Sequence, residues 1–308
     1  MRDEARRFAR AAPARHVRRR TGVTIADPRP ASPLRFDRPG ACVLDSRVMI
    51  AKVARSIRKR TGRLLGAPLK PEELLRRKTI ARVFLRGEGI EIGALHNPLK
   101  VPRRARVKYV DRLSHIELAK EHPELRSKLV RVDIVDDGET LATIPDSSQD
   151  FVIANHFVEH CQNPIGALRN MLRVLRRDGV LFLAIPDNRY TFDAGRPVTP
   201  IEHLLRDDLE GPSWSRRQHY EEWTRLVDKV PDDAGAGRHA EELMSRQAPI
   251  HYHVWSQVEL LELICALRRL HAFEVELIFK RDNEVLFVLR KSDEVPAAAQ
   301  AAGRAVGH

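Results

Sequence analysis

Short apolar runs alternate with longer amphipathic segments from about residue 81 onward. The apolar runs have the length and the turn-residue boundaries of buried strands. Five are expected, at residues 89–92, through ARVKYVD to Asp111, through LVRVDIVD to near Asp133, at residues 151–154 and at residues 180–185. Helical periodicity fills SHIELAKEHPELRSK and NPIGALRNMLRVLRRDG between them. Strands that alternate with helices predict an α/β fold with a parallel, doubly wound sheet.

The second helix and the C-terminal part of the chain add detail to this fold. Asn163 is the expected cap of the helix, Pro164 occupies its first turn, and Gly179 is expected to close its basic C-terminus. Near the end of the chain, FEVELIFK, the turn RDNE and VLFVLRK have the pattern of an antiparallel hairpin. We therefore predict a seven-stranded sheet over residues 81–292, mostly parallel, with a C-terminal antiparallel hairpin.

A long segment, residues 187–255, follows the fifth predicted strand and is interpreted as a helical lid insertion. Three helices are expected in it, in IEHLLRDD, PSWSRRQHYEEWTRLVDKV and GRHAEELMSRQ. Capping-box patterns at Thr199–Glu202 and Ser256–Glu259 predict the start of the first of these helices and of the helix LLELICALRRL that follows the insertion.

The N-terminal residues have a different composition. Residues 1–48 mix Arg, Ala and Pro without periodicity, which predicts a disordered basic leader; Met49 is an alternative start of the protein. Residues 49–80 are expected to form a basic amphipathic helical arm, either docked on the domain or in weak contact with a membrane surface. Residues 293–308 are expected to be a flexible tail.

The distribution of charge decides what the net charge of +12 means. Residues 1–80 hold 22 of the 54 Lys and Arg but only 7 of the 42 Asp and Glu, so the remainder has 32 basic and 35 acidic residues. A phosphate-binding domain needs its own basic face, so the folded part is not expected to bind nucleic acid. The three scattered cysteines and the lack of an 18-residue apolar run predict a cytoplasmic protein.

Ligands of doubly wound sheets bind at the carboxyl ends of the strands. The first predicted strand brings Glu91 and Gly93 to that edge, and the second brings Asp111. An acidic residue at the end of the second strand can accept both hydroxyls of a ribose. The third and fourth strands bring Asp133 and Asn155. The sequence thus places a nucleoside-type site here.

These motifs resemble those of the class I, Rossmann-like S-adenosylmethionine-dependent methyltransferases. The resemblance runs from about residue 87 to 291 and rests on IEIGA, KYVD, VDIVDD and the segment DSSQDFVIANHFVEHCQNPIGALRNMLRVLRRDGVLFLAIPD. It implies S-adenosyl-L-methionine as the cofactor. By the same resemblance, Glu91 and Gly93 form the turn, Asp111 with Arg112 holds the ribose, Asp133 with Ile134 holds the adenine, and Asn155 lines the methionine moiety.

The turn after the first strand departs from this family because Leu95 and Asn97 stand where later glycines are usual. Pro98 and Pro102 leave room for at most one helical turn before the second strand. We therefore expect the backbone of Gly93, Ala94 and Leu95, with the Asn97 amide, to hold the cofactor. A dinucleotide is disfavoured, since its pyrophosphate needs a close glycine approach and a helix N-terminus.

Three histidines are candidates for catalysis. In an extended IHYHVW, His251 and His253 would share one face, where either could act as a base or serve as a hinge of the lid, and His160 is the third candidate. The insertion has five histidines in all but no thiolates, and their spacing matches no structural zinc pattern, so no metal is expected.

The sequence thus predicts an S-adenosylmethionine-dependent methyltransferase. Its expected acceptor is a hydroxyl or amine of a small polar or glycan-type molecule, with polysaccharide biosynthesis suggested by the resemblance. The alternative is a catalytically degenerate binding module of the same fold. A nicotinamide oxidoreductase is disfavoured by the missing glycines and the terminal hairpin.

Overall fold

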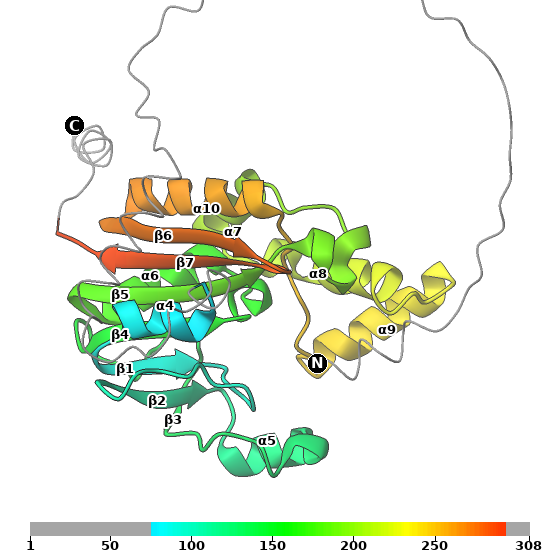
Figure 1. Cartoon of the computed structure of the whole chain (residues 1–308). Helices are drawn as coiled ribbons and strands as arrows, with labels where there is room; N and C mark the ends of the chain where they lie inside the picture. Colours follow the sequence, from blue (N-terminus) through cyan, green and yellow to red (C-terminus); the bar gives the residue numbers. More distant parts are fainter. Residues whose placement is uncertain (1–74, 294–308) are drawn as a thin grey trace, which may run out of the picture. The chain divides into compact units, whose positions relative to one another are not determined.

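The computed structural model describes residues 75–293, and in this part of the chain one sheet has seven strands (Figure 1). The order across the sheet is β3-β2-β1-β4-β5-β7-β6. Strands β1 to β5 pair in parallel, whereas β7 runs antiparallel to β5 and β6. The strands are β1 (Gly87–Ile92), β2 (Ala105–Asp111), β3 (Ile134–Val135), β4 (Gln149–Asn155), β5 (Leu175–Pro186), β6 (Phe273–Arg281) and β7 (Glu284–Lys291). The predicted fold class is confirmed.

The middle of strand β4 is apolar and buried because helices cover both faces of the sheet. In β4, Val152 and Ala154 pack in one core cluster with α6 (Pro164–Val174) and α10 (Gln257–Leu270). The alternate residues Phe151 and Ile153 pack in a second cluster with α4 (Arg77–Phe84). Since successive strand residues point to opposite faces, the two clusters are the two sides of the sheet. None of the described helices is long and apolar enough to cross a membrane.

Two predicted boundaries are wrong. Helix α6 has the predicted Asn163 cap and Pro164 but ends at Val174, because buried Leu175 turns extended and pairs with Gln149 of β4. Gly179 therefore lies inside β5 and closes no helix; a Cβ there would approach the Arg176 carbonyl oxygen to 2.8 Å, so glycine is required for space. The third strand is only Ile134–Val135 and begins after Asp133 instead of ending near it.

The insertion, residues 187–255, contains the three expected helices, α7 (Ile201–Glu210), α8 (Ser213–Leu226) and α9 (Asp233–Ser245). The capping box at Ser256 is present, but the one predicted at Thr199 is not. Thr199 instead exchanges hydrogen bonds with Val254: its N–H donates to the Val254 carbonyl at 2.8 Å, and its hydroxyl oxygen accepts from the Val254 N–H at 3.2 Å. These bonds tie the start of the insertion to its end.

The leader at residues 1–48, most of the arm at residues 49–80 and nearly all of the tail at residues 293–308 lie outside the described residues, so these domain assignments stay predictions. The boundary placed at residue 80 falls inside α4, which packs Ile80 and Ala81 against the sheet. Helix α5 (His115–Glu121) and a short 3-10 turn, η1 (Pro123–Leu125), connect β2 to β3.

Candidate functional site

Residues at the ends of three parallel strands form one row across the sheet. Ile92 of β1 is paired with Val110 of β2 on one side and with Ala154 of β4 on the other. The next residues along these strands are Gly93, Asp111 and Asn155. The structure thus brings three of the predicted cofactor-binding residues together at the carboxyl edge, and α7, α8 and α9 follow from the same end of β5 (Figure 1).

The buried side chain of Glu91 stabilises the turn after β1. This side chain is 1% exposed and accepts hydrogen bonds from the Leu99 N–H at 2.9 and 3.1 Å. Gly93 and Leu95 both have left-handed φ values, +63° and +48°, and the Leu95 carbonyl accepts from the Val130 N–H at 2.8 Å. Among the described residues, no helix lies between β1 and β2, which agrees with the prediction from Pro98 and Pro102. Glu91 therefore supports the turn from inside the domain.

Burial also changes the acidity of Glu91. Removal from water raises its pKa to about 7, against the lowering effect of the Leu99 N–H and of the Arg77 charge. Near neutral pH this carboxyl group is partly protonated, and its ionisation is coupled to the stability of the turn.

The Asp111 carboxylate can accept further hydrogen bonds. It is half-buried, accepts from the Leu113 N–H at 3.2 Å, and burial raises its pKa. The neighbouring Arg112 side chain is paired with Glu121 at 2.9 Å, and no ion pair to Asp111 is found among residues 75–293. Such a carboxylate at the end of β2 fits the two hydroxyls of a ribose.

Asp133 lies differently from the expectation. It is exposed, precedes β3, and accepts from the Tyr109 N–H at 2.9 Å. Asp136 is the acidic residue that follows β3, but it is buried and accepts from the Thr143 N–H and hydroxyl. The half-buried Ile134 packs against the core. The adenine contact assigned to Asp133 therefore lacks the strand-end geometry on which it depended.

Asn155 has the side chain most available to a polar ligand. The amide oxygen and nitrogen are buried and make no hydrogen bond within 3.5 Å to the described residues, although the amide lies close enough to the Glu91 carboxyl group to lower the pKa of that group. Buried amide groups are normally hydrogen-bonded, so an unpaired one at the carboxyl edge fits a polar contact to a bound molecule. Ala94 is half-buried and Asn97 is exposed in the turn beside it.

A charged cluster that the sequence did not predict follows Asn155. His156 Nε2 lies 2.9 Å from Glu284 Oε2, its Nδ1 lies 3.5 Å from Glu159 Oε1, and Arg77 contacts the same Glu284 oxygen at 2.6 Å. Burial lowers the pKa of His156, but the two carboxylates outweigh it and hold the pKa at about 9. The spacing of His156 and Glu159 was the available signal; Glu284 comes from β7 and could not be paired with them from sequence.

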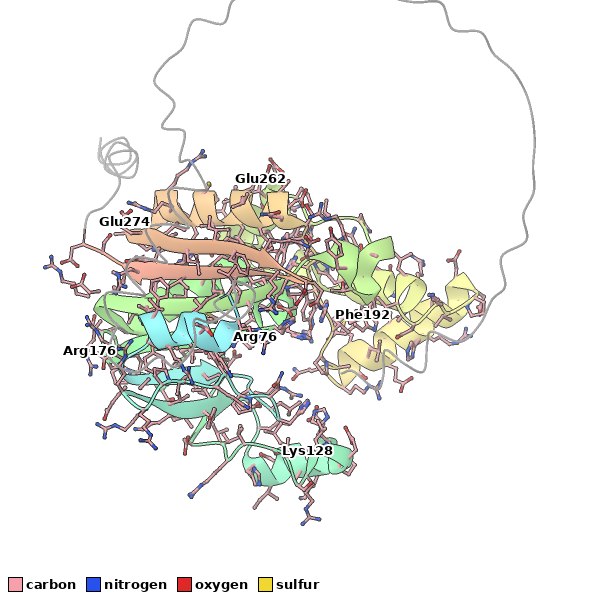
Figure 2. All side chains as sticks on the ribbon, in the orientation of Figure 1. Arg76, Lys128, Arg176, Phe192, Glu262 and Glu274 are labelled. Atoms are coloured by element: carbon pink, nitrogen blue, oxygen red, sulfur yellow. The ribbon has the colours of Figure 1, made fainter. Side chains whose placement is uncertain are left out.

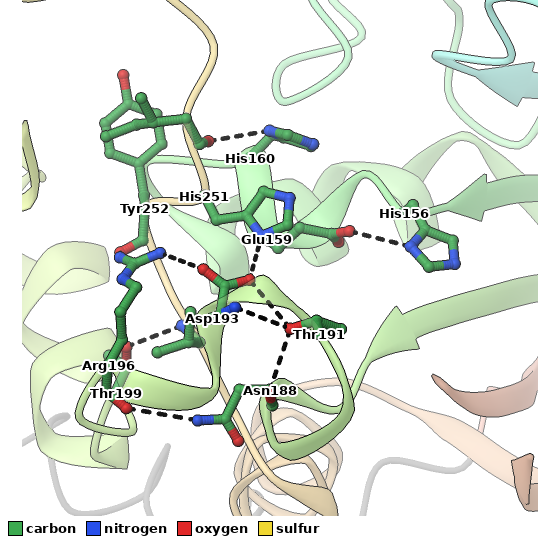
Figure 3. A network of polar contacts seen from close by, with 12 residues as sticks. His156, Glu159, His160, Asn188, Thr191, Asp193, Arg196, Thr199, His251 and Tyr252 are labelled. Atoms are coloured by element: carbon green, nitrogen blue, oxygen red, sulfur yellow. Dashed lines mark hydrogen bonds and ion pairs between the residues drawn. The ribbon is translucent and has the colours of Figure 1, made fainter. Parts of the chain in front are cut away.

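His251 is oriented by a buried carboxylate. Its Nδ1 lies 2.7 Å from Asp193 Oδ2, and Asp193 is also paired with buried Arg196 at 2.8 Å (Figure 3). His160 packs edge-on against His251, with ring centroids 4.7 Å apart, and donates from Nδ1 to the Ile250 carbonyl. Burial lowers the pKa of His160 to about 4, so this ring is neutral at physiological pH.

His253 lines the same small space as His251 but has other hydrogen-bond and ring partners. It is 0% exposed, its Nε2 lies 3.3 Å from the Gln162 carbonyl, and its ring contacts His203 and His219 instead. Burial lowers its pKa well below the usual value. His253 is fully buried and His251 is 4% exposed, so side chains that cover these rings must move before either ring meets an acceptor; the catalytic role of both histidines stays a prediction.

A cavity of about 540 Å³ adjoins the edge of the sheet. Arg112 and Glu121 line it from the segment after β2, and residues of α8, α9 and the segment up to Ile250 line it from the insertion. The lining from the insertion is mixed: four residues are polar (Asp228, His239, Arg246 and Gln247) and five are apolar (Trp223, Leu243, Ala248, Pro249 and Ile250). Such a cavity suits a hydroxylated or charged small molecule.

Part of this sequence is similar to known proteins. Residues 88–183 match the family model described as a methyltransferase domain. A Mycobacterium tuberculosis protein named "Probable S-adenosylmethionine-dependent methyltransferase" is 34% identical over 89 residues, which are 28% of this chain and 32% of that protein. The chain thus spans about a third of the length of this relative in the match.

Solved structures were also compared. The CurJ carbon methyltransferase is 12% identical, with a TM-score of 0.40, over 80% of this chain and 55% of that one. A SAM-dependent methyltransferase of Methanosarcina mazei is 15% identical, with a TM-score of 0.37, over 74% of this chain and 100% of that one.

Proposed function

We propose that this chain, which carries a class I S-adenosylmethionine-dependent methyltransferase domain, transfers a methyl group to a hydroxyl or amine of a small polar or glycan-type acceptor. The observation that carries the proposal is the row of Gly93, Asp111 and Asn155 at the carboxyl edge of a sheet in this family. The Asp111 carboxylate makes no ion pair among residues 75–293, and the buried Asn155 amide makes no hydrogen bond within 3.5 Å there.

In this proposal the cofactor lies along that row. Asp111 accepts the ribose hydroxyls, the Asn155 amide contacts the methionine moiety, and the turn at residues 93–97 closes around the amino-acid end. S-adenosylmethionine supplies an electrophilic methyl group on a sulfonium. The protein's task is to align the acceptor with that methyl group, exclude water and accept a proton.

We assign the proton-accepting role to His251. Its Nδ1 is fixed by Asp193, which leaves Nε2 as the ring nitrogen that can face an acceptor. Trp223 lies 5.9 Å from the His251 ring, centroid to centroid, and also lines the cavity, which links this ring to the proposed acceptor space. Exposed Phe192, visible beside the insertion helices in Figure 2, lies 4.9 Å from the same ring. A positioned base of this kind contributes about 10²- to 10⁴-fold to a rate.

The acceptor class follows from the lining of the cavity. Charged and polar side chains stand beside a similar number of apolar ones, and such a mixed lining with several charged groups favours a molecule that carries hydroxyl or amino groups. The rival proposal is a binding module of the same fold that has lost methyl transfer.

The test is methyl transfer from S-adenosylmethionine with a tritiated methyl group to a panel of amino sugars, nucleotide sugars and small polyols, using the full chain. We expect label on at least one polar acceptor, and a fall in turnover of about 10²-fold in His251→Gln with cofactor affinity retained. Cofactor binding without label on any acceptor supports the binding module. Full turnover in His251→Gln contradicts the role of this histidine.

A further inference from the structure

Four metal-binding side chains meet inside the insertion, apart from the cofactor row. His203 and Asp207 come from successive turns of α7, His219 from α8, and His253 from the segment before α10. One ligand atom of each lies within 4.8 Å of the corresponding atoms of the other three. Three segments separated by up to 50 positions in sequence therefore converge on one point.

The distances have the scale of a tetrahedral coordination shell. His203 Nε2 lies 3.2 Å from His219 Nε2 and 3.3 Å from Asp207 Oδ2, and His253 Nε2 lies 3.7 Å from the same oxygen. Four ligand atoms at about 2.0–2.1 Å from a zinc ion lie about 3.3–3.4 Å from one another at the corners of a tetrahedron. The observed separations leave space for such an ion between the side chains.

The cluster also has unsatisfied acceptors in a buried setting. Asp207 and His253 are 0% exposed and His219 is 7% exposed. Asp207 Oδ2 and His253 Nδ1 have no hydrogen-bond partner among the described residues. A buried carboxylate oxygen and a buried ring nitrogen without partners are costly unless something positive is bound to them.

The surrounding contacts orient the four side chains as an outer shell does. The Ser215 hydroxyl donates to Asp207 Oδ1 at 3.0 Å, which leaves Oδ2 turned to the cluster. The Gln162 carbonyl lies 3.3 Å from His253 Nε2, the ring nitrogen that faces Asp207 Oδ2, and so also lies beside the cluster. Trp255 stacks on His253, and Trp214 packs against His203. Hydrogen-bonded ligands within an apolar surround are typical of protein metal sites.

We propose that His203, Asp207, His219 and His253 bind one zinc ion that joins α7, α8 and the end of the insertion. Three imidazoles and one carboxylate are ligands that zinc accepts, and four protein ligands leave no open position, so the site is structural. It departs from the sequence-based expectation of no metal, which relied on missing thiolates and on spacing. The site does not depend on the proposed methyl transfer.

The experiment measures zinc by mass spectrometry in untagged, full-length protein from zinc-supplemented cells. We expect about one zinc per chain. When cobalt replaces zinc, we expect the visible absorption spectrum of one tetrahedral Co²⁺ ion. Removal with a chelator should lower the melting temperature, and added zinc should restore it. Protein without zinc or tetrahedral cobalt would overturn the proposal.

Two variants locate the ion. Asp207→Asn keeps the size of the side chain and an oxygen for Ser215, and we expect its zinc affinity to fall by at least about tenfold. His239→Ala is the matched control, because His239 lies on α9 and pairs with Asp228 outside the cluster; it should retain one zinc. Undiminished zinc affinity in Asp207→Asn would contradict this site, as would loss of zinc in His239→Ala. Should Asp207→Asn fail to fold, the cobalt spectrum of the wild type decides.

Discussion

The charged cluster around His156 makes stability depend on pH in a specific direction. His156 and Arg77 face the carboxylates of Glu159 and Glu284, so the cluster is electrically balanced only when His156 is protonated. The pKa of His156 is raised from 6.5 to about 9. A folded-state pKa above the unfolded one stabilises the protein fully below about pH 6.5, and that contribution is lost as the pH rises through about 9.

The perturbation is His156→Gln, which keeps a polar side chain of similar length but cannot be protonated. A rise in pKa from 6.5 to about 9 corresponds to about 3 kcal/mol. The side chain of His156 is 22% exposed, so solvent screening reduces this only modestly. The free energy of unfolding of the wild type, relative to the variant, should therefore be larger at pH 6 than at pH 10 by up to about 3 kcal/mol.

The assay is urea denaturation of both proteins at pH 6, 7, 8, 9 and 10. His122→Gln serves as the control, since the His122 ring is 31% exposed and its nearest carboxylate, in Glu124, is 3.8 Å away. The control shows how much of any pH dependence comes from replacing a histidine outside the cluster. The difference in the free energy of unfolding between the wild type and His156→Gln is the decisive quantity. If it stays constant or grows toward pH 10, His156 is neutral in the fold and the reasoning is refuted.

Three further predictions concern single side chains. Because burial raises the pKa of Glu91 from 4.5 to about 7, the free energy of unfolding of the wild type relative to Glu91→Gln should fall by about 3 kcal/mol between pH 4 and pH 8; no fall would contradict the buried setting. Asn155→Ala should weaken cofactor binding and lower the free energy of unfolding by at most about 1 kcal/mol, since the amide makes no hydrogen bond within 3.5 Å and interacts only weakly with the Glu91 carboxyl group; a larger loss of stability would argue for a structural role. Arg196→Met should destabilise the protein by about 3–5 kcal/mol because it leaves Asp193 buried without its cation, and a melting temperature equal to that of the wild type would contradict that ion pair.

The sheet was predictable because its strands are continuous apolar runs with sharp ends. Strand β2 ends at Asp111 as expected, and the final hairpin has the predicted turn. Strand β3 was misplaced because its two residues carry too little apolar pattern to fix a boundary. The end of α6 was misplaced because Leu175 is apolar in either a helix or a strand, and only its pairing with Gln149 decides between them.

The site was predictable only as far as strand ends define it. Gly93, Asp111 and Asn155 follow directly from the strands. The partners of the histidines did not follow, because His251 meets Asp193 across 58 positions and His156 meets Glu284 across 128. Alternation along IHYHVW was consistent with His251 and His253 lining one small space, but it could not give their different partners, Asp193 and the Gln162 carbonyl.

The central claim is that the row at the carboxyl edge binds S-adenosylmethionine through Asp111. Titration calorimetry of the full chain with S-adenosylmethionine, S-adenosylhomocysteine and NAD tests it most directly, with Asp111→Ala and the exposed-site control Asp137→Ala measured alongside. We predict one cofactor site per chain, no binding of NAD, and a loss of about 2–3 kcal/mol of binding free energy in Asp111→Ala only. Absence of binding by the wild type, or equal affinity in Asp111→Ala, would contradict the account.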